Sequence, residues 1–86
     1  MVYIIAVHLE NGEEHEHITK VNWQGGSNSN TCSRADMIGW LNKGNRAFVT
    51  DNVRTVEVGV VQASPPYLRT IADGRWTNNL LALPRF

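Results

Sequence analysis

The C-terminal stretch on which the rest of the chain depends runs Tyr67-Leu68-Arg69-Thr70-Ile71-Ala72-Asp73-Gly74-Arg75-Trp76-Thr77-Asn78-Asn79-Leu80-Leu81-Ala82-Leu83-Pro84-Arg85-Phe86. Neither the period of a helix nor the alternation of a strand runs through all of it. Large apolar residues are interspersed with Asp73, Asn78 and Asn79, whose side chains readily bond backbone groups. A disordered tail rarely contains so many large apolar residues. We therefore predict an ordered arm over residues 67–86 that packs across the rest of the fold.

Shorter elements are expected within and before this arm. Residues 67–71 favour a short strand, Asp73-Gly74 favours a turn, and residues 78–81 favour one helical turn that Pro84 closes. The preceding Pro65-Pro66 pair ends a strand and keeps the chain extended up to residue 67.

Length and composition predict a small globular protein. The chain has 86 residues, with 42% hydrophobic and 19% charged residues, so we expect a single domain over residues 1–86 with one core. The formal net charge is zero. Because phosphate neutralisation by basic residues supplies much of the affinity for nucleic acids, this balance argues against a nucleic-acid-binding protein.

The N-terminal sequence and the cysteine content favour a cytoplasmic location. Cys32 is the single cysteine, so the chain cannot form an internal disulfide, which suits a reducing compartment. The N-terminal residues lack the basic start and long apolar run of a signal peptide, so none is expected. The apolar residues 2–7 are too few to cross a membrane, so no membrane partner is expected.

The N-terminal half predicts a β-hairpin over residues 2–23. Residues 2–9 are rich in β-branched side chains, Asn11-Gly12 is a strong hairpin turn sequence, and residues 13–23 are expected to return as the second strand. Two registers are open. A two-residue loop pairs Glu10 with Glu13, whereas a three-residue loop with a left-handed Gly12 pairs Leu9 with Glu13. We favour the second register, which gives the cleaner apolar face.

The middle of the chain predicts a loop followed by one helix. Residues 24–30, which directly follow Trp23, contain no large apolar side chain and are typical of a flexible loop. The helix is expected over residues 33–43, with Ser33 as its N-cap and Gly44 at its end.

A second hairpin is expected over residues 46–62, with a turn at Asp51-Asn52 and alternating valines in its longer strand. The resulting order is β-β-α-β-β followed by the arm. This order predicts an α+β fold in which one helix packs on a mainly antiparallel sheet.

The arm resembles a known family. Its motif residues are Tyr67-Leu68-Arg69-Thr70, Asp73-Gly74, Asn78-Asn79-Leu80, Leu83-Pro84 and Phe86. They are similar to the pattern Y-L-R-S/T-x-x-D-G-x-x-x-N-N-L-x-x-L-P-x-F, which ends a family of short, largely bacterial domains of unknown function. The resemblance implies no activity, cofactor or catalytic residue, so it transfers no site to this chain.

The candidate binding residues of the arm are Arg69, Thr70, Asp73, Trp76, Asn78 and Asn79. In one interpretation, Arg69 and the two amides form a polar groove for an extended peptide, a carboxylate or a phosphate. In the other, Asp73 and the asparagines bond backbone in turns while Arg69 pairs with Asp73. The second is favoured because a buried arm must satisfy its own backbone. Trp76 is expected to be partly exposed, as an aromatic contact for a partner.

Other constellations are weaker. His15 and His17 lie two apart on the expected second strand, so they would share a face and could begin a metal site, although no third ligand is evident. Cys32 precedes the expected helix, where a thiol pKa is lowered, but no histidine base can be assigned to it.

The favoured function is a non-enzymatic binding or protein-interaction module without a cofactor, whose partner is a protein or peptide. The alternative is a nucleic-acid-associated accessory protein that uses the basic residues Arg34, Lys43, Arg46, Arg69 and Arg75. A small metal- or thiol-dependent enzyme is a third hypothesis. An open sheet edge would also allow a homodimer, which no particular residue argues for.

Overall fold

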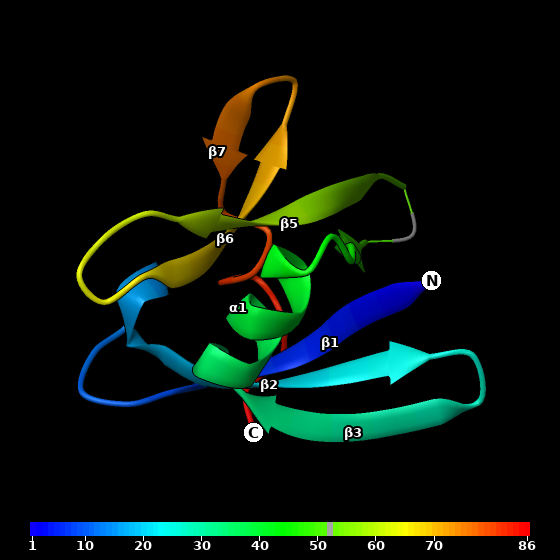
Figure 1. Cartoon of the computed structure of the whole chain (residues 1–86), viewed down its shortest axis with the longest axis horizontal. Coiled ribbons are helices and arrows are strands. Elements are labelled where there is room, and N and C mark those ends of the chain that lie inside the picture. Colours follow the sequence, from blue (N-terminus) through cyan, green and yellow to red (C-terminus); the bar gives the residue numbers. More distant parts are fainter. Residues whose placement is uncertain (52) are drawn as a thin grey trace.

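The computed structural model describes residues 1–51 and 53–86 and shows a mostly β protein (Figure 1). Its strands are β1 (Val2–Leu9), β2 (Ile18–Gly25), β3 (Asn28–Ser33), β4 (Ala47–Thr50), β5 (Thr55–Val61), β6 (Tyr67–Ala72) and β7 (Arg75–Thr77). The helices are a short 3₁₀ helix η1 (His15–His17) and α1 (Arg34–Asn42). Asn52, expected in a turn with Asp51, lies outside the described residues.

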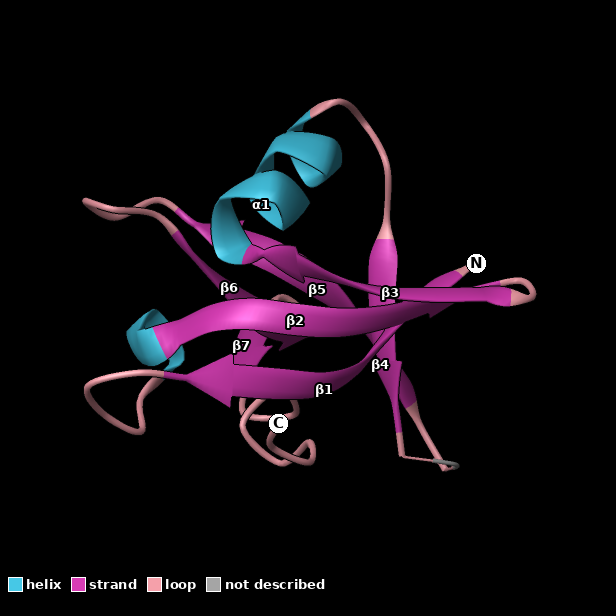
Figure 2. Ribbon diagram, turned by 90° about the horizontal axis from the view of Figure 1, so that it is seen from below, coloured by secondary structure: helices cyan, strands magenta, loops and turns pink. Residues whose placement is uncertain are grey.

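The seven strands form one sheet in the order β3-β2-β1-β4-β5-β6-β7. It consists of two antiparallel meanders, β1–β3 and β4–β7, joined by a short parallel pairing of Val2 with Ala47 and Tyr3 with Phe48. The helix α1 contacts β2 and β3 of the first meander and β5 and β6 of the second. It therefore lies across the junction of the two meanders, as Figures 1 and 2 show.

The predicted α+β class and the β-β-α-β-β order are wrong. The described residues contain seven strands and one α-helix, of nine residues. The predicted flexible loop 24–30 is replaced by a turn at Gly26 (φ 60°) and the strand β3. β3 is polar because it is an edge strand with most of its residues exposed, so it has no apolar alternation to reveal it.

Both predicted registers of the first hairpin are also wrong. Leu9 pairs with Ile18, so the connection is longer than expected and contains η1. The left-handed residue of this connection is Asn11 (φ 65°), and Gly12 lies against a side chain of η1. A Cβ atom on Gly12 would lie 2.4 Å from Cε1 of His17, because the imidazole packs directly on the glycine.

The predicted helix is confirmed as α1. The Ser33 hydroxyl caps its N-terminus by accepting a hydrogen bond from the Asp36 N–H at 3.1 Å. Gly44, with φ of 95°, takes the left-handed conformation that commonly follows a helix. Met37 and Ile38 are buried against the sheet and attach α1 to the core.

The predicted arm divides into two parts. Residues 67–77 form the β6–β7 hairpin, and the last residues of the chain meet β1 in a parallel bridge between Arg85 and Val7. The Val7 N–H donates to the Pro84 carbonyl at 3.0 Å, and the Phe86 N–H donates to the Val7 carbonyl at 3.2 Å. Leu80 is 0% exposed and fills the core beneath this segment. The buried core consists of Ile4, Val7, Ile18, Val21, Met37, Ile38, Ala47, Val49, Val56, Val58, Leu68 and Leu80.

Candidate functional site

The polar residues of the arm motif bond mainly to one another. Thr70 is 0% exposed, and its hydroxyl lies 2.6 Å from the hydroxyl of Thr77. The Thr77 hydroxyl donates to Oδ1 of Asn79 at 2.7 Å, and the Asn79 N–H donates to the Thr70 hydroxyl at 3.2 Å. We call Thr70, Thr77 and Asn79 the hydroxyl network. Thr77 was not singled out from the sequence, although its position directly opposite Thr70 in the β6–β7 ladder creates the network.

Arg69 contacts the same segment and not Asp73. Its Nε donates to the Thr77 carbonyl at 3.1 Å, and its Nη2 donates to Oδ1 of Asn78 at 3.0 Å. Asp73 and Gly74 have φ values of 55° and 76° and form the exposed turn of the β6–β7 hairpin, as predicted for this pair. The expected Arg69–Asp73 pairing is therefore wrong.

Trp76 lies on the exposed side of the same hairpin. It is 43% exposed, which confirms the prediction of partial exposure. Its ring lies over Gly59 of β5, where an added Cβ atom would approach Cζ3 of the indole to 3.1 Å. Part of the Trp76 surface therefore covers β5, and part faces solvent.

His15 and His17 do not share a strand face, because both lie in η1. His15 is 5% exposed, and its Nε2 has no hydrogen-bond partner among the described residues. Burial and the nearby charge of Arg69 lower the pKa of His15. Nδ1 of His17 accepts a hydrogen bond from the Glu14 N–H at 3.0 Å. In the part of the chain that the structure describes, no three His, Cys, Asp or Glu residues gather as a metal site.

Three of the basic residues in the nucleic-acid hypothesis have partners within the protein. The Arg34 guanidinium donates to the Glu16 carbonyl at 2.8 Å, and the Arg46 guanidinium forms a two-bond ion pair with Glu57 at 2.9 and 3.0 Å. Arg69 bonds the arm as described above. Arg34 begins α1, Arg46 directly precedes β4 and Arg69 lies in β6.

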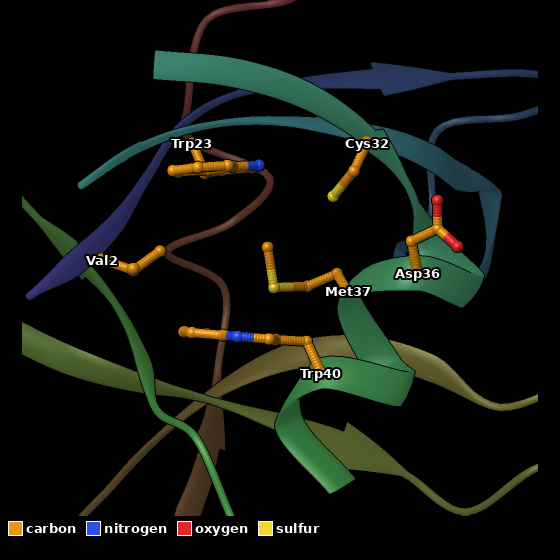
Figure 3. A pocket seen from close by; sticks show the side chains of 6 residues that line it. All are labelled: Val2, Trp23, Cys32, Asp36, Met37 and Trp40. Carbon is orange, nitrogen blue, oxygen red and sulfur yellow. The ribbon is translucent and has the colours of Figure 1, made fainter. Parts of the chain in front are cut away.

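A pocket of about 240 Å³ lies between α1 and the first meander (Figure 3). Its lining residues are Val2, Trp23, Cys32, Asp36, Met37 and Trp40. Figure 3 shows the Trp23 and Trp40 side chains on opposite sides, with Met37 reaching between them and Asp36 at the margin beside Cys32. We call this the tryptophan pocket.

The local sequence explains why these side chains converge. On β2, Trp23 follows the buried Val21 by two residues, so both point to the inner face of the sheet. Cys32 pairs with Val21 across the β2–β3 ladder and shares that face. On α1, Trp40 follows Met37 by three residues and Asp36 by four, so the three side chains lie on neighbouring parts of the helix surface.

The pocket is mostly apolar, with one acidic side chain. Asp36 is the only ionisable carboxylate among the described residues that line it, and no lysine, arginine or histidine lines it. Burial, together with the charge of Asp36, raises the pKa of the Cys32 thiol. This direction is opposite to the one expected for a reactive cysteine at a helix N-terminus, so Cys32 contributes a small, protonated, weakly polar surface.

These features define a small, mostly β protein with a two-tryptophan pocket at the junction of a helix and an edge hairpin. The chain belongs to the family described as "Protein of unknown function (DUF3892)", whose model matches residues 3–84. The expectation of a domain family of unknown function is confirmed at this level. No curated protein matches the chain, and no solved structure matches it.

None of the helices that the structure describes is both long and apolar enough to cross a lipid bilayer.

Proposed function

We propose that this protein is a non-enzymatic binding module that holds one side chain of a protein or peptide partner in the tryptophan pocket. The observation that carries the proposal is the pairing of Trp23 and Trp40, each only half-buried, across a pocket of about 240 Å³. Tryptophan is enriched among the residues that dominate binding energy, because its large surface is apolar and loses little rotational freedom.

The lining chemistry supports binding over catalysis. The pocket offers apolar walls and a single carboxylate, which is typical of a recognition site with one orienting polar group. Cys32, the obvious nucleophile, has a raised pKa and no histidine beside it among the lining residues. The pocket therefore has the means to hold a group but lacks an activated nucleophile.

The neighbouring strand supports a peptide as the partner. β3 is the outermost strand of the sheet on this side, and it contributes Cys32 to the pocket. An extended peptide can add to such an edge through backbone hydrogen bonds while a side chain enters an adjacent pocket. The Thr31 N–H already donates a local hydrogen bond to Oδ1 of Asn30 at 2.8 Å, so the added strand would replace that bond.

We further propose that the module acts in the bacterial cytoplasm. The resemblance of its arm to a largely bacterial family supports the source. The single cysteine, which is half-buried and has a raised thiol pKa, suits a reducing compartment.

A titration of the ¹⁵N-labelled protein with the neutral probes p-cresol and cyclohexylmethanol tests the proposal. We expect millimolar binding, on the order of −4 kcal/mol, because small fragments bury little surface. The indole N–H signals of Trp23 and Trp40 should shift, while that of Trp76 stays in place as an internal control. The variant Trp76→Phe assigns the third indole signal. If neither pocket indole responds to either probe, the proposal is wrong.

A further inference from the structure

We infer that the side chain received by the tryptophan pocket is an arginine of the partner. This inference rests on the proposed function and specifies the chemistry of its ligand. The first observation is the charge of the site, because Asp36 is exposed and forms no ion pair with any described residue. Since none of the described residues that line the pocket is basic, a cation that enters it meets one carboxylate, at the margin beside Cys32 (Figure 3), and no repulsion from the lining residues.

The position of Asp36 has a second explanation that does not account for the whole site. An acidic residue in the first turn of α1 interacts favourably with the positive end of the helix. This effect explains why a carboxylate suits the position. It does not explain why Trp23 and Trp40, from two different elements, lie on opposite sides of the pocket, with Met37 between them and Asp36 at the margin (Figure 3).

The aromatic walls favour a cation of a particular kind. The indole face is the best aromatic partner for a cation, and the attraction increases when the site excludes water. A guanidinium is planar and weakly hydrated, so it stacks on aromatic faces at a smaller desolvation cost than an ammonium. The Met37 thioether between the indoles is a flexible and polarisable surface that can adjust to such a group.

Hydrogen bonding distinguishes arginine from lysine and from alkylated ammonium groups. A carboxylate accepts two parallel N–H bonds from a guanidinium, which gives both affinity and orientation. An ammonium offers a point charge, and a trimethylammonium offers no N–H at all. Val2 provides an apolar surface along which the methylene stem of an arginine can lie.

The test compares the peptides acetyl-Gly-Gly-X-Gly-Gly-amide in which X is arginine, citrulline, lysine or trimethyllysine. Citrulline has almost the same shape as arginine but carries no charge. We expect the arginine peptide to bind about tenfold more tightly than the citrulline peptide, because it adds a cation–π contact and a charged hydrogen-bond pair. The affinities are measured from the shifts of the Trp23 and Trp40 indole signals.

The variant Asp36→Asn isolates the contribution of the carboxylate. We expect Asp36→Asn to reduce the affinity for the arginine peptide several-fold and to leave the affinity for the citrulline peptide unchanged. The control Glu13→Gln, in the exposed first loop, should alter neither affinity. The comparison of the arginine and citrulline peptides on the unmodified protein shows whether the pocket prefers the charged side chain, even if a variant fails to fold.

The outcomes separate the inference from the proposed function. Equal affinities for arginine and citrulline overturn the inference, and so does tighter binding of lysine or trimethyllysine than of arginine. In both cases a response of the two pocket indoles still supports the binding module. If no peptide and neither neutral probe shifts the Trp23 and Trp40 signals, both the inference and the proposed function are wrong.

Discussion

The β6–β7 hairpin with its following arm and the tryptophan pocket both gather side chains that can bind a ligand, but they differ in what those side chains already contact. In the first region, Thr70, Thr77 and Asn79 bond to one another and Arg69 bonds the arm. In the second, the faces of Trp23 and Trp40 remain partly accessible and Asp36 has no ion-pair partner among the described residues. The comparison indicates that a polar motif can serve mainly to hold the fold together, and we therefore place the proposed binding site in the apolar pocket.

The largest effect is expected when the apolar contact beneath the arm is removed. Leu80→Ala should lower the free energy of unfolding by about 3 kcal/mol, because it removes a fully buried side chain and leaves a cavity. Urea unfolding followed by circular dichroism measures the loss. Val53→Ala, at a side chain that is 94% exposed, is the control and should stay within about 0.5 kcal/mol of the parent. A small effect of Leu80→Ala would mean that the arm is not part of the cooperative fold.

The hydroxyl network is tested by Thr70→Val, which keeps the shape of the side chain and removes its hydroxyl. We expect a loss of about 2 kcal/mol, because the Asn79 N–H and the Thr77 hydroxyl lose a partner in a partly buried site. The same change at the exposed Thr55 is the matched control, to be compared by urea unfolding. If both substitutions change the free energy of unfolding by the same small amount, the polar residues of the arm motif become candidate binding residues again.

The pH dependence of stability tests the packing of η1 against β6. Because the pKa of His15 is lowered in the folded state, its contribution to stability is fully present above the ordinary value of 6.5 and is lost as the pH falls below it. The free energy of unfolding should therefore decrease by up to about 1 kcal/mol per pH unit in that range. Urea unfolding between pH 7.5 and pH 5 measures the slope, to be read against the same series for His17→Gln. His15→Leu should flatten the slope, and an unchanged slope in His15→Leu would contradict the assignment.

The smallest effect on stability is expected in the tryptophan pocket. Asp36→Asn should change the free energy of unfolding by no more than about 0.5 kcal/mol, because the side chain is exposed and the N-cap bond uses the backbone N–H of Asp36. Thermal and urea unfolding provide the measurement. A loss comparable to that of Thr70→Val would show that Asp36 is part of the fold's structural bonding, and the contrast between the two regions would disappear.

The sequence predicts the elements whose determinants are local. Ser33 and Gly44 mark the ends of α1, and the paired positive φ values of Asp73 and Gly74 follow from the turn chemistry of that dipeptide. The alternating valines similarly locate β5, where Val56 and Val58 are buried. Each of these features depends on residues that are neighbours in the chain.

The features that sequence analysis missed depend on distant contacts. β3 is polar and exposed, and it exists because its backbone pairs with β2, which no side-chain pattern within residues 28–33 reveals. The long β1–β2 connection follows from the burial of His15 against the second meander. Since the tryptophan pocket requires both β3 and the placement of α1, its existence could not be inferred before the topology was available.

The most direct test of the contrast between the two regions is a single titration of the ¹⁵N-labelled protein with p-cresol, in which the three tryptophan indole signals are followed together. Our account predicts that the signals of Trp23 and Trp40 shift with one common dissociation constant while the signal of Trp76 stays fixed. A shift of the Trp76 signal with the two pocket signals unchanged would contradict the account, because it would place the binding surface on the β6–β7 hairpin.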